Sequence, residues 1–260
     1  MELNLKNKVV GVTGAASEKG IGYAIAKKML EEGAKVVVCD LNAEAVENAA
    51  KQLSAYGEVL GVVADVSNEA AVNSMFEQAK AHFGTVDVFV NNAGIYPQSL
   101  LMDMAESQWD MVMRVNLKSV FLCAKAAYAV MKKKGGVLIN AASYAAVIAS
   151  AGSGAYAASK SAVYSLTKTL AAELAPYGIR VCGFIPGVIE TGMTQKAVEE
   201  RADQLVEQIA LHRLGKPVDV ANAVAFLASD AASYLTGNFI EISGGKLCVQ
   251  NPDYPYQHRR

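Results

Sequence analysis

A tyrosine and a lysine four positions apart, Tyr156 and Lys160, are the residues whose types and spacing suggest chemistry most directly. In a helix this spacing puts both side chains on one face, one turn apart. A phenol with a pKa of about 10 is a poor acid or base at neutral pH. A neighbouring ammonium group stabilises the phenolate and lowers that pKa towards the range useful for proton transfer. Tyr-x-x-x-Lys is also common as an ordinary surface pair, so the pair alone predicts no activity.

A glycine-rich turn, residues 13–22, follows the first run of apolar residues and precedes a helical pattern. Its glycines allow a tight turn and let backbone N–H groups reach a pyrophosphate at the positive end of the helix. Asp40 ends the next apolar run, 18 positions after Gly22, where a carboxylate can accept from both ribose hydroxyls of an adenosine. Taken alone, the glycine-rich turn can equally be a structural turn that binds no ligand. Asp40 alone can equally be a helix N-cap.

Short β-branched runs alternate with helical patterns along the chain and predict the elements that position these residues. Strands are expected over residues 9–13, 35–39, 59–63, 86–90, 137–141, 180–185 and 239–242, and helices over 20–32, 43–54, 68–82, 109–132 and 155–175. Asn42 can cap the second of these helices. The strands lack apolar/polar alternation, which is typical of strands covered on both faces. We therefore predict one α/β domain with a doubly wound parallel sheet, and Ser143 just beyond its fifth strand, where such sheets bind ligands.

The composition excludes several other classes of function. Among 260 residues, 24 Lys and Arg balance 25 Asp and Glu, a net charge of −1, which leaves no strong basic field for nucleic acid or an anionic membrane. The cysteines form no Cys-x-x-Cys pair and the histidines have no metal-ligand spacing, so we expect reduced thiols and no metal. Residues 135–159 are uncharged but interrupted by polar side chains and glycines, and residues 1–6 lack the apolar core of a signal peptide. We expect a cytoplasmic protein without a membrane span.

In their order and spacing these residues resemble the short-chain dehydrogenase/reductase family, from about residue 6 to about residue 245. The motifs that carry the resemblance are Thr13-Gly14, Gly20-Ile21-Gly22, Asp65-Val66, Asn91-Asn92-Ala93-Gly94, Asn116, Ser143, Tyr156-Ala157-Ala158-Ser159-Lys160 and Pro186-Gly187-Val188-Ile189-Glu190-Thr191. The resemblance implies a Rossmann-like, seven-stranded parallel sheet in one domain, residues 1–245, with a C-terminal extension, residues 246–260. It also implies a nicotinamide cofactor and a homotetramer in which helices such as 155–175, with small residues at Ala155, Ala158 and Ala162, pair across two-fold axes.

The same resemblance implies a role for each site residue. Tyr156 is the expected general acid/base, Lys160 holds the ribose hydroxyls and lowers the pKa of Tyr156, Ser143 hydrogen-bonds the reacting oxygen, and Asn116 holds a water that links Lys160 to solvent. The expected cofactor-binding residues are Gly14, Gly20, Ile21, Gly22, Asp40, Leu41, Asp65, Val66, Asn92, Ala93, Gly94, Tyr156, Lys160, Pro186, Gly187, Ile189 and Thr191. Asp65 and Val66 flank the adenine, residues 92–94 form the floor, and Pro186, Gly187, Ile189 and Thr191 lie on the nicotinamide side.

Three departures from the family pattern affect these expectations. Five residues, Ala15 to Lys19, separate the first two glycines where three are usual, so the contacts of the phosphate loop cannot be transferred one by one. Cys182 stands where the family commonly has asparagine, which puts a local hydrogen bond in doubt. The aromatic extension, residues 246–260, runs past the usual end, as a disordered end or as part of a subunit contact.

Two residues give opposite indications about the cofactor. Lys19 stands where relatives using the 2′-phosphorylated cofactor often have a basic residue, whereas Asp40 would face that phosphate, and Leu41 and Asn42 supply no compensating cation. Because a carboxylate beside a dianion costs more than one flexible lysine returns, the sequence predicts NAD.

The substrate is expected to be a small alcohol or ketone bound by Tyr96, Ser143, Tyr144 and Tyr156. Tyrosine rings and hydroxyls suit a polyhydroxy or cyclic alcohol, and the pocket segments hold no basic cluster up to Lys196, although Arg201 and Arg213 follow. A secondary alcohol of a sugar-like polyol or small diol is the main expectation. A hydroxysteroid and a 3-oxoacyl thioester are the alternatives, and a non-catalytic scaffold is disfavoured by the intact Asn116, Ser143, Tyr156 and Lys160.

Overall fold

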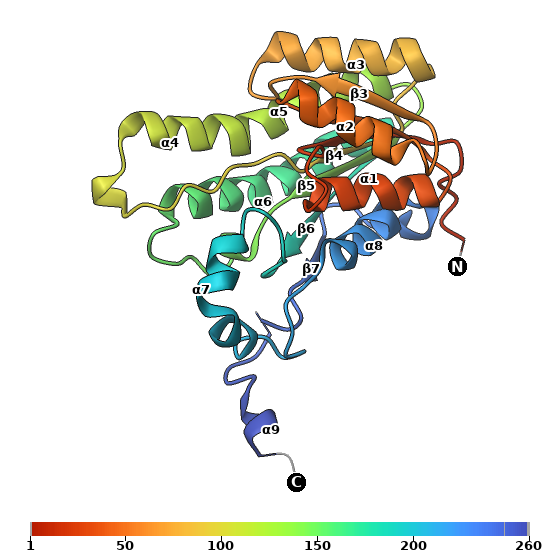
Figure 1. Ribbon diagram of the computed structural model, residues 1–260. Coiled ribbons are helices and arrows are strands. Elements are labelled where there is room, and N and C mark those ends of the chain that lie inside the picture. Colours follow the sequence, from red (N-terminus) through yellow and green to blue (C-terminus); the bar gives the residue numbers. More distant parts are fainter. Residues whose placement is uncertain (1, 247, 259–260) are drawn as a thin grey trace.

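Seven strands form one parallel sheet in the computed structural model, which describes residues 2–246 and 248–258 (Figure 1). They are β1 (Val9–Thr13), β2 (Lys35–Asp40), β3 (Val59–Val63), β4 (Val88–Asn91), β5 (Gly136–Ala141), β6 (Ile179–Pro186) and β7 (Phe239–Ile242). Their order is β3-β2-β1-β4-β5-β6-β7, with every neighbouring pair parallel. The order reverses between β1 and β4, which is the point where open α/β sheets bind ligands. The predicted doubly wound, Rossmann-like single domain is confirmed.

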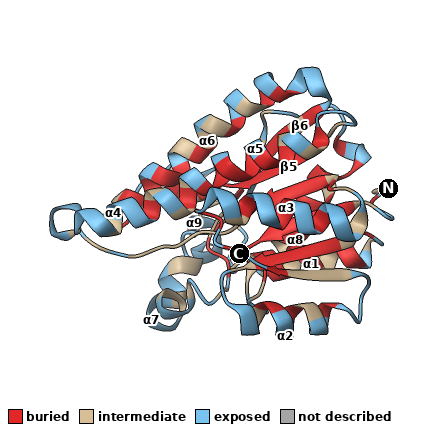
Figure 2. Ribbon diagram, turned by 90° about the horizontal axis from the view of Figure 1, so that it is seen from above, coloured by how far each residue is buried: buried red, intermediate tan, exposed pale blue. Residues whose placement is uncertain are grey.

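Helices cover both faces of this sheet. They are α1 (Ile21–Glu31), α2 (Ala43–Leu53), α3 (Glu69–Phe83), α4 (Glu106–Met113), α5 (Ser119–Met131), α6 (Gly154–Leu174), α7 (Gln195–Val206), α8 (Pro217–Ala228) and α9 (Tyr254–Gln257). Residues of α1, α2 and α8 pack on one face, and residues of α3, α5 and α6 on the other. Figure 2 shows the strands buried between helices whose outer sides are exposed. This double cover explains why the strands are unbroken apolar runs.

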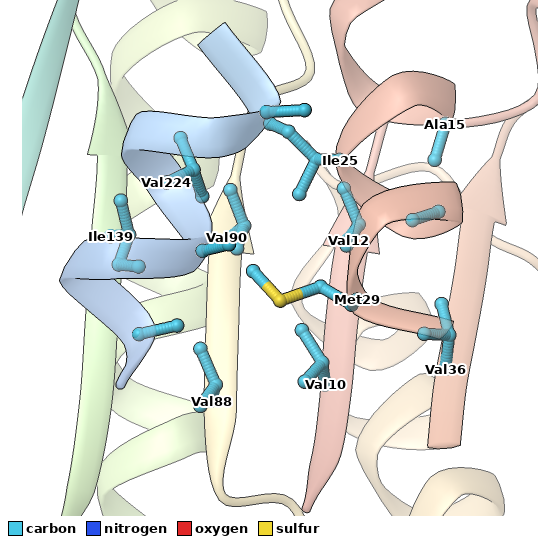
Figure 3. Packing of buried hydrophobic residues seen from close by; sticks show 14 of the residues in the cluster. Val10, Val12, Ala15, Ile25, Met29, Val36, Val88, Val90, Ile139 and Val224 are labelled. Atoms are coloured by element: carbon cyan, nitrogen blue, oxygen red, sulfur yellow. The ribbon is translucent and has the colours of Figure 1, made fainter. Parts of the chain in front are cut away.

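The core beneath the glycine-rich turn is made by β1, β4, α1 and α8. Figure 3 shows Ile25 and Met29 of α1 and Val224 of α8 packed over Val12 and Val90 of the sheet, and all five side chains are fully buried. Close packing of this kind resists displacement of either helix. The N-terminus of α1 is therefore held at the carboxyl end of β1, next to β4.

Local signals set the ends of several helices. The Asn42 side chain accepts a hydrogen bond from the Ala45 backbone N–H at 2.9 Å, so the predicted cap of α2 is confirmed. Asn68 caps α3 in the same way. Gly84 ends α3 with φ +83°, a left-handed conformation that glycine adopts without steric cost.

Two parts of the helical prediction differ from the structure. The helix predicted over residues 109–132 starts at Glu106 and is interrupted by a π-helical turn, Arg114–Lys118. No helix was expected between residues 187 and 239, where α7 and α8 lie. The start of α8 carried a readable signal, because Pro217 occupies its first turn and Asp219 accepts from the Lys216 backbone N–H at 2.8 Å.

The described part of the C-terminal extension packs on its own chain, whereas the sequence analysis weighed only a disordered end or a subunit contact. Tyr256 stacks on His212 with ring centroids 4.2 Å apart and donates to the Ala210 carbonyl at 2.8 Å. His212 in turn contacts Asp253 at 3.0 Å. The extension therefore covers the segment between α7 and α8. Its residues 247, 259 and 260 lie outside the described residues.

Within the described ranges, no helix has the length and apolar character needed to cross a membrane. The uncharged stretch over residues 135–159 is instead divided among β5, a 3-10 turn and the start of α6.

Candidate active site

A cavity of 680 Å³ opens at the carboxyl ends of the central strands. Fourteen residues expected to bind the cofactor line it: Gly14, Gly20, Ile21, Asp40, Leu41, Asp65, Val66, Asn92, Ala93, Gly94, Tyr156, Lys160, Pro186 and Thr191. Gly22, Gly187 and Ile189, which were also expected to bind the cofactor, are not among the residues that line it. The volume is within the roughly 300–1,000 Å³ range of small-molecule and cofactor sites.

The glycines form a cradle with no room for side chains. Gly14 has φ +63°, and a Cβ placed there would lie 2.9 Å from Ala93 Cα. A Cβ on Gly22 would lie 2.3 Å from the Gly14 carbonyl oxygen and 2.6 Å from Asn92 Nδ2. Glycine is therefore required at both positions, so that α1 can begin against the end of β1.

Side chains at the ends of β1 and β4 tie the two strands together beside this cradle. Thr13 Oγ1 accepts from the backbone N–H groups of Asn92 and Ala93 at 3.0 and 3.1 Å. Asn92 Nδ2 donates to the carbonyls of Thr13 and Gly14. The floor of the cavity is thus held in place by hydrogen bonds across the switch point.

The Asp40 carboxylate faces the lengthened loop, residues 15–19. Its two oxygens accept from the Leu41 backbone N–H at 2.8 Å and from the Ala16 backbone N–H at 3.2 Å. The loop closes on itself through the Gly20 N–H, which donates to the Ser17 carbonyl at 2.8 Å. Asp40 and Leu41 line the cavity, whereas Lys19 does not. The contact between Asp40 and Ala16 anchors the two extra residues of this loop.

Asp65 and Val66 close the cavity on the β3 side. The Asp65 carboxylate accepts from the Ser67 backbone N–H at 2.9 Å, which holds the turn after β3. Val66 is 8% exposed and contributes an apolar wall. Such a wall suits one face of a flat aromatic ring.

Ser143 and Tyr156 are in hydrogen-bonding contact. Ser143 is buried at the start of a 3-10 turn after β5, and its Oγ accepts from the Ala145 N–H at 3.2 Å. Tyr156 lies in the first turn of α6, and its ring is edge-on to that of Tyr96 with centroids 4.7 Å apart. Burial raises the pKa of Tyr156 to about 12, and hydrogen bonding with Ser143 works against this rise. The phenol is therefore protonated at neutral pH and able to donate a proton.

Lys160 lies one turn further along α6, as the four-residue spacing predicts. Its Nζ is 5.8 Å from the Tyr156 ring centroid and donates to the Ala141 carbonyl at 2.8 Å. Burial lowers the pKa of Lys160 to about 8. Burial has the largest effect on the pKa of Tyr156, and the lowering of that pKa by Lys160 stays a prediction.

Asn116 lies in the π-helical turn between α4 and α5 and is fully buried. Its side chain accepts from the Ile95 N–H at 2.8 Å and donates to the Ile95 carbonyl and to Ser159 Oγ. A Cβ on Gly94 would lie 3.3 Å from Asn116 Oδ1 and 3.6 Å from Lys160 Nζ. The amide thus anchors the segment after β4 beside the lysine. π-Turns occur frequently at functional sites.

The end of β6 and the segment after it contribute to the wall of the cavity. Pro186 and Thr191 line it, and the Gly187 backbone N–H donates to the Ile242 carbonyl at 2.9 Å. Thr194 Oγ1 donates to the Ile189 carbonyl and accepts from the Thr191 N–H, which orders the turn before α7. In β6, the local hydrogen bond that the sequence put in doubt at Cys182 is made by its thiol, which donates to the Leu235 carbonyl at 3.2 Å.

Two of the four expected substrate residues line a cavity, each a different one, whereas Ser143 and Tyr96 line neither of these cavities. Tyr156 lines the first cavity, and Tyr144 lines a second one of 880 Å³ between the segment after β5, helix α7 and the C-terminal extension. Tyr96 reaches Tyr156 by ring contact. Sequence reasoning missed Met111 and Arg114, which also line the first cavity. No motif marks them: Met111 lies in α4, and Arg114 is the first residue of the π-helical turn.

Among the residues that the structure describes, no cluster of three His, Cys, Asp or Glu side chains could hold a metal ion.

The chain is similar to known proteins over nearly its whole length. A family model described as enoyl-(acyl carrier protein) reductase matches residues 14–246. A 3-oxoacyl-[acyl-carrier-protein] reductase of Salmonella typhimurium is 39% identical over 248 residues, 95% of this chain and all of that protein. The protein of that name from Staphylococcus epidermidis is 41% identical over 242 residues, 92% of this chain and 98% of its own length.

Solved structures agree with the fold. A putative short-chain alcohol dehydrogenase from Sinorhizobium meliloti superposes with a TM-score of 0.91 at 33% identity, covering 96% of this chain and all of that one. A short-chain type dehydrogenase/reductase from Mycobacterium marinum gives 0.90 at 34% identity, covering 95% and 98%.

Proposed function

The chain belongs to the short-chain dehydrogenase/reductase family, and we propose that it uses NAD(H) to interconvert a 3-oxoacyl compound and its 3-hydroxy counterpart. Family membership makes the protein an oxidoreductase with a nicotinamide cofactor. The observation that carries the proposal is that Tyr156 and Lys160 share a cavity with the glycine cradle, and that Ser143 is in hydrogen-bonding contact with Tyr156.

The residues present fit a nicotinamide dinucleotide. The cradle that a Cβ on Gly14 or Gly22 would fill leaves backbone N–H groups for a pyrophosphate. Asp40 would accept from the ribose hydroxyls, and Asp65 and Val66 would flank the adenine. Pro186, Gly187, Ile189 and Thr191 would lie on the nicotinamide side. When bound, the cofactor supplies or accepts a hydride at C4 of its nicotinamide ring.

The protein's own groups would handle the proton and the charge. In reduction, Tyr156 gives its phenolic proton to the carbonyl oxygen, and Ser143 donates a hydrogen bond to that oxygen as charge develops on it. Lys160 holds the ribose and places its positive charge beside the phenolate that remains, and Asn116 would hold a water linking Lys160 to solvent. In oxidation the proton transfer takes place in the opposite direction through the same groups.

The relatives' names support a 3-oxoacyl substrate over the polyol that the sequence analysis favoured. Tyrosine rings and hydroxyls around the site suit either compound. The two classes are separated by measuring NADH consumption with a 3-oxoacyl thioester and NAD+ reduction with a panel of polyols and small diols. We expect kcat/KM to be higher for the thioester, and a higher value for a polyol would restore the first expectation.

The cofactor prediction concerns Asp40. We expect the wild type to prefer NAD over its 2′-phosphorylated form by well over tenfold, because the carboxylate accepts from the ribose hydroxyls and repels a phosphate. Asp40→Ser is expected to weaken NAD binding and relax the preference, and adding Leu41→Arg is expected to relax it further, since guanidinium binds phosphate bidentately. The measurement is the ratio of kcat/KM for the two cofactors.

Lys19→Ala is the control for this prediction. Lys19 does not line the cavity, so the ratio is expected to stay nearly unchanged. If the wild type favours the phosphorylated cofactor and Lys19→Ala loses that preference, then Lys19 and not Asp40 determines the choice of cofactor.

A second prediction concerns pH. In reduction Tyr156 acts as an acid, and its pKa of about 12 keeps it protonated across the accessible range. Lys160, with a pKa lowered to about 8, is charged below that pH and neutral above it. We therefore expect kcat/KM for reduction, which reports the free enzyme, to be flat below pH 8 and to fall above it. A profile that rises through pH 8 would contradict the role of the Lys160 charge.

A third prediction concerns assembly into a homotetramer. Of the small residues expected to form a subunit contact on α6, Ala155 is buried within its own chain and cannot take part, whereas Ala158 is exposed. Large apolar side chains remain exposed nearby, with Phe121 50% and Met102 91% accessible. Exposed apolar area of this kind favours a subunit contact. Sedimentation at micromolar concentration is expected to show a tetramer, and a monomer would contradict the prediction.

A further inference from the structure

The second cavity adjoins the candidate active site through Tyr144. This residue follows Ser143 directly in the chain and lines the second cavity. Its phenol also contributes to the raised pKa of Tyr156. A substrate that contacts Ser143 and Tyr156 can therefore extend past Tyr144 into this space.

Two cations, Arg201 and Lys246, line this cavity. Arg201 lies at a kink inside α7, and Lys246 lies in the turn after β7 with its Nζ 5.7 Å from the Tyr144 ring centroid. Burial lowers the pKa of Lys246, and the positive charge of Arg201 lowers it further. Both cationic side chains therefore line the same cavity.

Neither Arg201 nor Lys246 is held in an ion pair with a carboxylate among the described residues. Glu207 and Asp253 also line the cavity. Asp253 contacts His212 and accepts from the Gln257 amide, and Glu207 forms no ion pair with either cation. The Lys246 ammonium donates instead to the neutral Gln208 side chain. Two neighbouring cations without a counterion favour binding of an anion.

We propose that Arg201 and Lys246 form a subsite for an anionic group, a carboxylate or a phosphate, at the end of the substrate remote from the reacting carbonyl. This inference rests on the proposed function, since it places the reacting carbonyl at Ser143 and Tyr156. The Tyr144 ring lies between the two positions, so the anion and the carbonyl are separated by several bonds. The substrate class becomes an oxo or hydroxy acid, or an acyl thioester whose carrier arm bears a phosphate.

A binding measurement without turnover tests the subsite itself. Glutarate, which has carboxylates but no ketone, is titrated calorimetrically into the wild type, Arg201→Gln, Lys246→Gln and the double variant. We expect each single variant to bind about tenfold more weakly, because each removes one charged partner of the carboxylate, and the double variant to show no binding. Lys196→Gln is the matched control, since Lys196 is an 86% exposed cation of α7 outside the cavity.

Turnover then identifies the source of the anion. One arm compares kcat/KM for a short oxo acid and its methyl ester, and the other compares a 3-oxoacyl pantetheine with its 4′-phosphate. We expect the charged member of at least one pair to be favoured about tenfold in the wild type, with the preference lost in the double variant and retained in Lys196→Gln.

The outcomes separate this inference from the proposed function. Glutarate binding that is lost in the double variant supports the subsite even if no ketone is reduced, in which case the proposed function is wrong and the subsite remains. Glutarate binding equal in the wild type and the double variant, or absent from both, overturns the subsite even if the neutral 3-oxoacyl compounds are reduced. Arg201→Lys, which keeps the charge, is expected to recover most of the affinity that Arg201→Gln loses.

Discussion

Replacing Tyr156 with phenylalanine is expected to lower kcat by at least about 10²-fold, the loss typical when a general acid/base is removed. The ring and its edge-on contact with Tyr96 are kept, so the packing at the start of α6 is preserved. Lys160 and the glycine cradle are untouched, and cofactor affinity is therefore expected to change little. Steady-state kinetics and a direct titration with NADH measure the two quantities separately.

Tyr164→Phe is the matched control for this variant. Tyr164 lies on the same helix, two turns further on, and stacks on Phe239 with ring centroids 4.4 Å apart. It lines neither cavity, so the same loss of a hydroxyl is expected to leave kcat unchanged. If Tyr156→Phe keeps more than a tenth of the wild-type kcat, the assignment of Tyr156 as the proton donor is wrong.

Gly22→Ala is expected to weaken NADH binding on the order of a hundredfold, the second largest effect. The new Cβ would lie 2.3 Å from the Gly14 carbonyl oxygen and 2.6 Å from Asn92 Nδ2, so the cradle must open or α1 must shift. Overpacking of this kind costs about 1–3 kcal/mol, and here it acts on the backbone that we propose holds the pyrophosphate. The readouts are the NADH dissociation constant and the melting temperature.

Gly192→Ala provides the comparison, since Gly192 lines the same cavity but a Cβ there meets nothing within 4 Å. We expect its NADH affinity and melting temperature to match the wild type. A Gly22→Ala protein that also matches the wild type in both would show that close packing at Gly22 is not needed for the cofactor site.

The sequence predicted the fold and the gathering of the site because both depend on local spacing and on topology. Apolar runs without alternation indicated strands covered on both faces, and parallel strands bring their carboxyl ends to one edge. The four-residue spacing of Tyr156 and Lys160 needs only a helix to place them together. The glycine-rich turn and Asp40 likewise follow from the ends of neighbouring strands.

The features that sequence analysis missed depend on contacts between distant segments. The π-turn around Asn116 arises where α4 continues into α5, and no residue type marks it. The pKa of Tyr156 follows from burial, which a count of neighbouring charges along the chain does not include. Arg201 and Lys246 come from α7 and from the turn after β7, so only the folded chain brings them to one cavity.

The lengthened phosphate loop is an intermediate case. Its two extra residues were evident in the sequence, but the partner that anchors them was not. That partner is Asp40, which accepts from the Ala16 backbone N–H. The carboxylate therefore has a structural contact in addition to its proposed role towards the ribose, and Asp40→Ser is expected to loosen the loop as well as to change cofactor preference.

The most direct test of the central claim follows the hydride itself. The protein is incubated with a 3-oxoacyl thioester and NADH carrying deuterium at C4 of the nicotinamide, and the product is examined by mass spectrometry and NMR. We predict one deuterium on the carbinol carbon of the 3-hydroxyacyl product, formed by the wild type and by Tyr164→Phe and at least about 10²-fold more slowly by Tyr156→Phe. A 3-hydroxyacyl product without deuterium at that carbon, or no reduction of any ketone with NADH, would contradict NAD(H)-linked hydride transfer at this site.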